Sequence, residues 1–161
     1  GKDFTPAEVI LMSLAVPFRP ILLVEDNPMD LDLTQRAFSR RRVMNPFELA
    51  RDGEEAIDWI RRWDEGAPIP VLILLDLKLP RVDGMDVLRR YKGHPLYRSI
   101  PVVVLTTSAE DRDIETAYQL GANSYIVKPV EFEKFVEVAA QIEVYWTLLN
   151  QPPPLHFSQI S

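Results

Sequence analysis

The sequence of 161 residues contains no cysteine and only two histidines. The absence of cysteine excludes disulfides, thiolate nucleophiles and cysteine-ligated metal sites, and it fits a reducing cytoplasm. No apolar run approaches the roughly 18 to 20 residues that a membrane-spanning helix needs, so no membrane contact is expected. The 24 acidic residues outnumber the 18 basic ones and give a formal net charge of −6. This charge argues against a nucleic-acid partner, because binding to a phosphate backbone needs positive charge.

The hydrophobic fraction of 47% is typical of one globular domain with a sizeable core. We expect this domain to span residues 20–149. The residues before it divide at Met12, the expected natural start, into a leader left by expression cloning (1–11) and a lead-in (12–19). Residues 150–161 include three consecutive prolines and are expected to form a tail or an arm that packs on a neighbouring subunit.

Strand-like and helix-like segments alternate five times through the domain. The predicted strands are 21–26, 46–50, 71–76, 100–108 and 123–129, and the predicted helices are 27–41, 53–63, 84–92, 110–121 and 131–149. Asn27 and Pro28 suit the start of the first helix, and Gly121 suits the left-handed end of the fourth. The predicted inner face of the second helix contains Ala56, Ile57, Ile60 and Trp63. Because three of the strands are continuous apolar runs, we predict an α/β fold with a doubly wound, five-stranded parallel sheet.

Chemically active side chains stand at the ends of these strands, where ligands bind in open parallel sheets. The residues at these positions are Glu25, Asp26, Asp76, Thr106, Thr107 and Lys128. Carboxylates about 4 to 5 Å apart repel each other, so such a group must take up protons or bind a cation. Oxygen ligands without thiols favour a hard ion, Mg²⁺ or Mn²⁺.

Four motifs occur in order at the strand ends: "LLVEDN", "LILLDLKLPRVDG", "VVVLTTS" and "GANSYIVKP". Together they resemble the receiver domain of two-component response regulators, over about Pro20 to Leu149. The resemblance implies a flavodoxin-like (βα)5 fold with strand order 2-1-3-4-5.

The resemblance also implies a role for each residue of the predicted site. Asp76 matches the phosphoacceptor, and Lys128 matches the lysine that contacts the phosphoryl group. Glu25 and Asp26, together with Asp76 and the backbone carbonyl of Lys78, match the metal ligands. Glu25 departs from the commonest pattern, which has aspartate there, but its longer arm still permits contact through water.

Thr106 and Tyr125 match the switch pair, in which the hydroxyl moves toward the phosphate and the ring turns inward. The implied function is a phosphorylation-dependent signalling protein that accepts a phosphoryl group on Asp76 from a partner histidine kinase. Such a protein is not an enzyme with a turnover of its own, although it assists its own Mg²⁺-dependent phosphotransfer and dephosphorylation.

A narrower resemblance indicates the kind of partner. The "EDNP" opening and the stretch "YKGHPLYRSIPVVVLTTS" are similar to stand-alone, single-domain regulators that partner phytochrome-type, light-sensing histidine kinases. Only residues 150–161 follow Leu149, which leaves no room for an output domain, so the output is expected to be a protein–protein contact.

The last predicted helix has two apolar stripes. The stripe expected to dock on the sheet contains Phe132, Phe135, Ala139, Ile142, Trp146 and Leu149. A second stripe of Val138, Tyr145 and Leu148 is not needed for docking and predicts a homodimer. The resemblance places that dimer on the face formed by residues 110–121, 123–129 and 131–149.

Three other functions compete with this interpretation. A phosphate-independent pseudo-receiver scaffold predicts no response to acetyl phosphate or beryllofluoride. An aspartyl-phosphate hydrolase of the haloacid dehalogenase kind needs a second aspartate two residues after the nucleophile, where this chain has Lys78. A flavodoxin-like flavin protein needs a hydroxyl-rich phosphate loop, whereas "EDNPMD" would repel phosphate.

Overall fold

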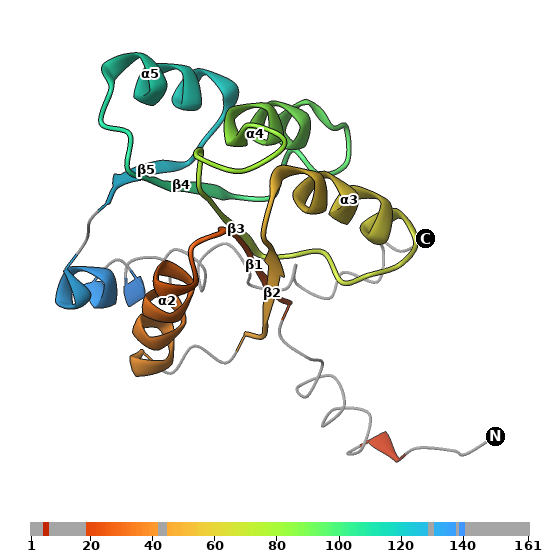
Figure 1. Cartoon of the computed structure of the whole chain (residues 1–161). Coiled ribbons are helices and arrows are strands. Elements are labelled where there is room, and N and C mark those ends of the chain that lie inside the picture. Colours follow the sequence, from red (N-terminus) through yellow and green to blue (C-terminus); the bar gives the residue numbers. More distant parts are fainter. Residues whose placement is uncertain (1–4, 7–18, 42–44, 129–130, 138, 141–161) are drawn as a thin grey trace.

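Five parallel strands form the central sheet of the computed structural model, which describes residues 5–6, 19–41, 45–128, 131–137 and 139–140 (Figure 1). The strands are β1 (Ile21–Val24), β2 (Phe47–Ala50), β3 (Leu72–Leu75), β4 (Val102–Thr106) and β5 (Ser124–Val127). Their order is β2-β1-β3-β4-β5, and all four neighbouring pairs are parallel. The predicted doubly wound fold and its strand order are confirmed.

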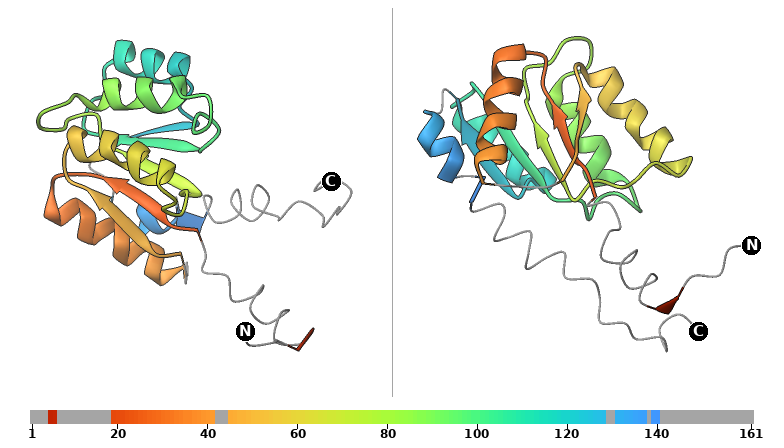
Figure 2. Two further views of the ribbon diagram at one scale, coloured as in Figure 1. Left: turned by 90° about the vertical axis from the view of Figure 1, so that its right-hand side faces the viewer. Right: turned by 90° about the horizontal axis from the view of Figure 1, so that it is seen from below.

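Helices cover both faces of the sheet (Figures 1 and 2). On one face lie α3 (Gly53–Asp64), α4 (Gly84–Gly93) and α5 (Asp111–Leu120). On the other lie α2 (Pro28–Arg40) and a last helix, of which residues 132–137 and 139–140 are described. This arrangement buries the three central strands, β1, β3 and β4, along their whole length, which is why their sequences are apolar runs, whereas the edge strands β2 and β5 are partly exposed. Among the described residues, no helix combines the length and the apolar character required to cross a membrane.

Alternate residues of each central strand enter different hydrophobic clusters. In β1, Leu22 and Val24 pack with α3 and α4, whereas Ile21 and Leu23 pack on the side of α2. In the last helix, Phe135 and Ala139 are buried and Phe132 is half-buried. The other members of its predicted inner stripe lie outside the described residues.

The predicted helix ends match those of the structure. The Asn27 side chain accepts hydrogen bonds from two backbone N–H groups in the first turn of α2, and Pro28 occupies the first helical position. Gly121 ends α5 with φ = 111°, in the left-handed region that favours glycine.

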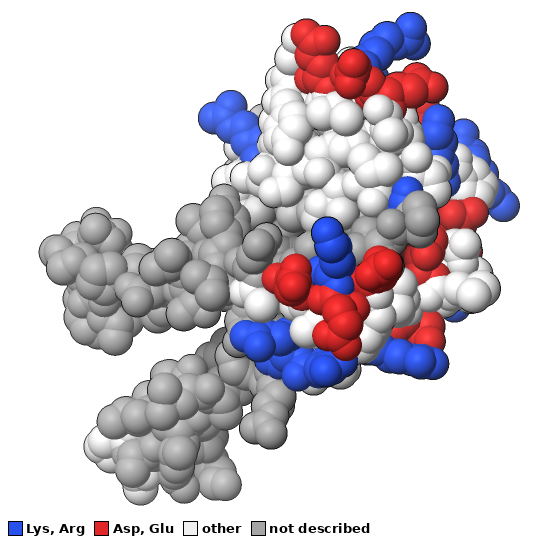
Figure 3. Space-filling model, turned by 90° about the vertical axis from the view of Figure 1, so that its left-hand side faces the viewer, with Lys and Arg blue, Asp and Glu red and all other residues white. Residues whose placement is uncertain are grey.

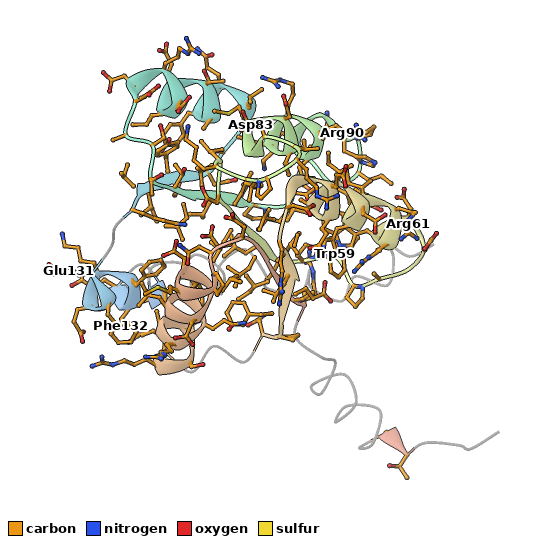
Figure 4. All side chains as sticks on the ribbon, viewed as in Figure 1. Trp59, Arg61, Asp83, Arg90, Glu131 and Phe132 are labelled. Atoms are coloured by element: carbon orange, nitrogen blue, oxygen red, sulfur yellow. The ribbon has the colours of Figure 1, made fainter. Side chains whose placement is uncertain are left out.

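The inner face of α3 differs in part from the prediction. Ala56 and Trp63 are buried, but Ile57 and Ile60 are only half-buried at the margin of the core. Trp59 is buried instead, and its indole N–H donates to a backbone carbonyl of β2 at 3.2 Å (Figure 4). The helix is apolar over a wide arc, and the large indole ring fills the space beside the edge strand.

Candidate functional site

Three carboxylates converge at the carboxyl ends of β1 and β3. Glu25 and Asp26 follow β1, and Asp76 follows β3. Each offers one oxygen, and these three atoms lie within 4.8 Å of one another. Glu25 and Asp76 are buried, whereas Asp26 is exposed. The sheet therefore brings together the three acids that the sequence places at its strand ends.

Lys128, directly after β5, places its ammonium group among these acids. Its Nζ lies 2.8 Å from an oxygen of Glu25, 3.0 Å from one of Asp30 and 3.2 Å from one of Asp76. The backbone N–H of Lys128 donates to the carbonyl of Thr106 at 2.7 Å, which fixes the start of the lysine side chain beside β4. The ammonium thus has an acceptor for each of its three N–H bonds.

Asp30 was not predicted to belong to this site. It lies in the first turn of α2, where an acid is commonly explained by the helix dipole alone. The available signal was its position in the first turn of the helix that starts directly after Glu25 and Asp26, at the same end of the sheet.

The backbone holds Asp76 rigidly. Its N–H donates to the carbonyl of Val24 at 3.0 Å, and one carboxylate oxygen accepts from the N–H of Lys78 at 3.0 Å. Gly84, at the start of α4, lies directly against this segment: a Cβ there would come within 2.3 Å of the Asp76 carbonyl oxygen and 2.5 Å of the Leu77 Cα. The close approach explains why glycine ends the "LPRVDG" motif.

Burial and mutual contact change the protonation of these groups. Desolvation raises the pKa of Glu25 to about 9, and its hydrogen bond with Asp76 acts in the same direction. Burial alone would also raise the pKa of Asp76, but hydrogen bonds with Glu25 and the Lys78 N–H, and the charge of Lys128, lower it overall. Burial lowers the pKa of Lys128, but its bonds to Glu25 and Asp30 outweigh this and raise it. These directions favour the protonated form of Glu25 beside an ionised Asp76 and a charged Lys128.

The donor set fits a hard divalent cation. Three carboxylates, one of them open to solvent, suit an ion that keeps part of its water shell, such as Mg²⁺ or Mn²⁺. Because the raised pKa of Glu25 favours its protonated form, a cation bound by its carboxylate would compete with that proton. The metal role of the Lys78 carbonyl stays a prediction.

Thr106 and Tyr125 are connected through the loop after β4. Thr106 is fully buried, and its hydroxyl oxygen accepts a long hydrogen bond of 3.5 Å from the N–H of Ser108. The Tyr125 hydroxyl donates to the carbonyl of Ser108 at 2.9 Å, and the Ser108 hydroxyl donates to Asp113 of α5 at 2.5 Å. In the described part of the chain, Thr106 makes no hydrogen bond to Asp76. Ser108 is thus the common neighbour of the two predicted switch residues.

Comparison with known proteins decides the family. Residues 21–140 match the response regulator receiver domain. The chain belongs to the receiver-domain family of response regulators.

Several relatives of this receiver are known. It is 44% identical to the probable methanogenesis regulatory protein FilR2 of Methanothrix harundinacea, over 83% of this chain and 86% of the relative. It is 37% identical to the response regulator Rcp1 of Synechocystis, over 81% of this chain and 90% of the relative.

Solved structures of response regulators superpose on this receiver. The phosphorylated cyanobacterial phytochrome response regulator RcpA superposes with a TM-score of 0.74 at 39% identity, covering 84% of this receiver and 98% of RcpA. The Mn²⁺-bound form of Rcp1 superposes with a TM-score of 0.71, covering 80% of this receiver and 94% of Rcp1.

The remaining residues singled out in the sequence are Val138, Tyr145 and Leu148, the predicted dimer stripe. All three lie outside the described residues.

Proposed function

We propose that this receiver accepts a phosphoryl group on Asp76 from a phosphohistidine of a partner histidine kinase. The observation that carries the proposal is the burial of Asp76 beside Lys128, with the oxygens of Glu25 and Asp26 close enough to share one cation. An ionised carboxylate is needed for attack on phosphorus, and the lowered pKa of Asp76 keeps it ionised.

The reaction forms one bond and breaks another. A carboxylate oxygen of Asp76 attacks phosphorus, the bond from phosphorus to the histidine nitrogen breaks, and that nitrogen keeps the electron pair. Phosphoryl transfer depends mainly on positioning and charge neutralisation. The Lys78 N–H holds one oxygen of Asp76, and Lys128 places its positive charge at the other.

We infer that Mg²⁺, or Mn²⁺, is held by Glu25, Asp26, Asp76 and the backbone carbonyl of Lys78. When bound, the ion offsets the negative charge of the phosphoryl oxygens. The cluster of three carboxylates and the Mn²⁺-bound form of Rcp1 support this assignment.

After transfer, the new charge is proposed to draw the Thr106 hydroxyl toward the phosphoryl group. Thr106 is joined to Ser108, and Ser108 to Tyr125 and to Asp113 of α5. A movement at Thr106 would therefore reach β5 and α5, and the output would be a protein contact on that side of the molecule.

We propose a phytochrome-type histidine kinase as the partner. RcpA, a phytochrome response regulator, is 39% identical to this chain, and the superposition covers 98% of RcpA. FilR2, at 44% identity, is named as a probable methanogenesis regulatory protein and not as a phytochrome regulator, so phosphotransfer should be compared between phytochrome-type and other histidine kinases.

The test is phosphotransfer from a radiolabelled kinase with and without Mg²⁺, using the wild type, Asp76→Asn and the control Asp86→Asn. Asp86 is a carboxylate on the surface of α4 that pairs with Arg89. We expect Mg²⁺-dependent label on the wild type and on the control, and none on Asp76→Asn. A wild type that takes no label from any histidine kinase would favour the pseudo-receiver scaffold.

A further inference from the structure

The third partner of Lys128, Asp30, is held firmly by α2. The Asn27 side chain accepts the N–H of Asp30 at 3.4 Å, and the buried hydroxyl of Thr34 donates to its carbonyl at 2.8 Å. The Asp30 side chain is 31% exposed, whereas the Lys128 side chain is only 6% exposed. A capped helical turn thus presents one carboxylate to a lysine that is otherwise enclosed.

Asp30 differs from the other two partners in one respect. Glu25 and Asp76 belong to the acidic cluster, so a cation bound there uses the carboxylates that now contact the ammonium. Asp30 is not a member of that cluster. Of the three partners, it is the one that stays available to Lys128 when the cation and the phosphoryl group are in place.

We propose that Asp30 is a positioning residue that anchors the Lys128 ammonium beside Asp76 while cation and phosphoryl group occupy the other carboxylates. The inference rests on the proposed function of Asp76 as phosphoacceptor. Asp30 acts through Lys128 and is not itself a ligand of the phosphoryl group.

Two effects of Asp30 oppose each other. Its hydrogen-bonded ion pair with Lys128, at 3.0 Å, restricts a long side chain that would otherwise populate many rotamers. Its negative charge also repels the incoming phosphoryl group. Because the Asp30 carboxylate is partly exposed, solvent screens its longer-range repulsion of the phosphoryl group. The ion pair with Lys128 is a direct contact and is screened less. We therefore expect anchoring to prevail.

Helix α2 offers a matched control for the simpler role of an acid in a helix. Asp32 lies on the same helix, is 59% exposed and pairs with Arg36 at 2.8 Å. Removing its carboxylate changes the charge of α2 by the same amount without touching Lys128.

The experiment measures the binding of beryllofluoride, a phosphoryl mimic, by fluorine NMR in saturating Mg²⁺. Asp30→Ala is expected to bind about five- to tenfold more weakly than the wild type. Asp30→Asn keeps an acceptor oxygen on a side chain of nearly the same shape, so it keeps the test valid if Asp30→Ala misfolds. Its affinity for beryllofluoride should lie between those of the wild type and Asp30→Ala. Asp32→Ala should match the wild type. The affinity of Asp30→Ala for Mg²⁺ alone should stay near that of the wild type, because Asp30 is not a ligand.

A second readout follows the Lys128 ammonium directly, as its proton NMR signal in Mg²⁺. The signal should persist in the wild type and Asp32→Ala, and exchange away with water in Asp30→Ala. Unchanged or tighter beryllofluoride binding by the Asp30 variants, with the ammonium signal intact, would overturn the anchoring role. A wild type that does not bind beryllofluoride would instead contradict the proposed function, and the ammonium signal would still decide the role of Asp30.

Discussion

Lys128 is the only basic side chain within 3.2 Å of Asp76 in the described part of the chain, and its ammonium contacts the two buried acids that follow β1 and β3. A buried ion pair is weak evidence for stability, but leaving its acids without a cation is costly. Removing either sign of charge from this site should therefore change the stability of the protein.

Lys128→Met should lower the free energy of unfolding by about 3 kcal/mol in metal-free buffer, because the buried, ionised Asp76 loses its counter-charge. Added Mg²⁺ should restore more stability to this variant than it adds to the wild type. Urea unfolding with and without Mg²⁺ measures both effects, and Lys134→Met, on the exposed side of the last helix, is the control. Equal stability of the two variants without Mg²⁺ would contradict the account.

The raised pKa of Glu25 predicts how metal-free stability depends on pH. Folding favours its protonated form, so this contribution is fully present below the ordinary value of 4.5 and is lost as pH rises toward about 9. Stability should fall across that window in the wild type and fall less in Glu25→Gln, which cannot ionise. Thermal unfolding at several pH values in chelator tests this, and parallel pH profiles for the two proteins would refute it.

At the scale of the elements, the loop between β3 and α4 fixes the phosphoacceptor. Gly84 allows the first turn of α4 to lie against the backbone of Asp76 and Leu77. Backbone atoms cannot move aside as the end of a flexible side chain can, so the space is fixed.

Gly84→Ala should therefore destabilise the protein by about 1 to 3 kcal/mol and displace the Asp76 segment. Gly93→Ala, at the other end of α4, meets no atom within 4 Å and should be neutral or slightly stabilising. Urea unfolding of both variants gives the comparison. A neutral Gly84→Ala would show that the loop does not hold Asp76 as described.

Much of this element-scale picture could be predicted from the sequence. The apolar runs of β1 and β3 are followed by Glu25 and Asp76, and β5 is followed by Lys128, so these residues could be placed together at the carboxyl ends of the strands. The strand order came only from the resemblance to a family, because the alternation of strands and helices fits several orders. Trp59 was missed because α3 is apolar over a wide arc, and Asp30 because its contact crosses from α2 to the end of β5.

At the scale of the whole molecule, α2 and the last helix lie side by side on one face of the sheet (Figures 1 and 2). Arg40 of α2 pairs with Glu133 at 2.8 Å and lies over the Phe132 ring at 5.6 Å (Figure 4). Acidic and basic side chains adjoin one another in Figure 3, which views the molecule from the left of Figure 1. The predicted stripe of Val138, Tyr145 and Leu148 lies outside the described residues, and from the sequence pattern we propose that it forms a homodimer contact.

Charged substitutions on that stripe should weaken self-association. We predict that Tyr145→Glu with Leu148→Glu shifts the protein from dimer to monomer by at least about tenfold in dissociation constant, because an apolar contact is replaced by like charges. Sedimentation equilibrium measures the change, with Glu137→Ala on the exposed side of the helix as the control. A wild type that is monomeric at all concentrations would remove the proposal.

The most direct measurement of the central claim is the mass of the intact protein after incubation with acetyl phosphate. We expect the wild type to gain one phosphoryl group only when Mg²⁺ is present, on the peptide that contains Asp76, and Asp76→Asn to gain none. A phosphoryl group carried by any other residue, or gained equally by Asp76→Asn, would contradict that claim.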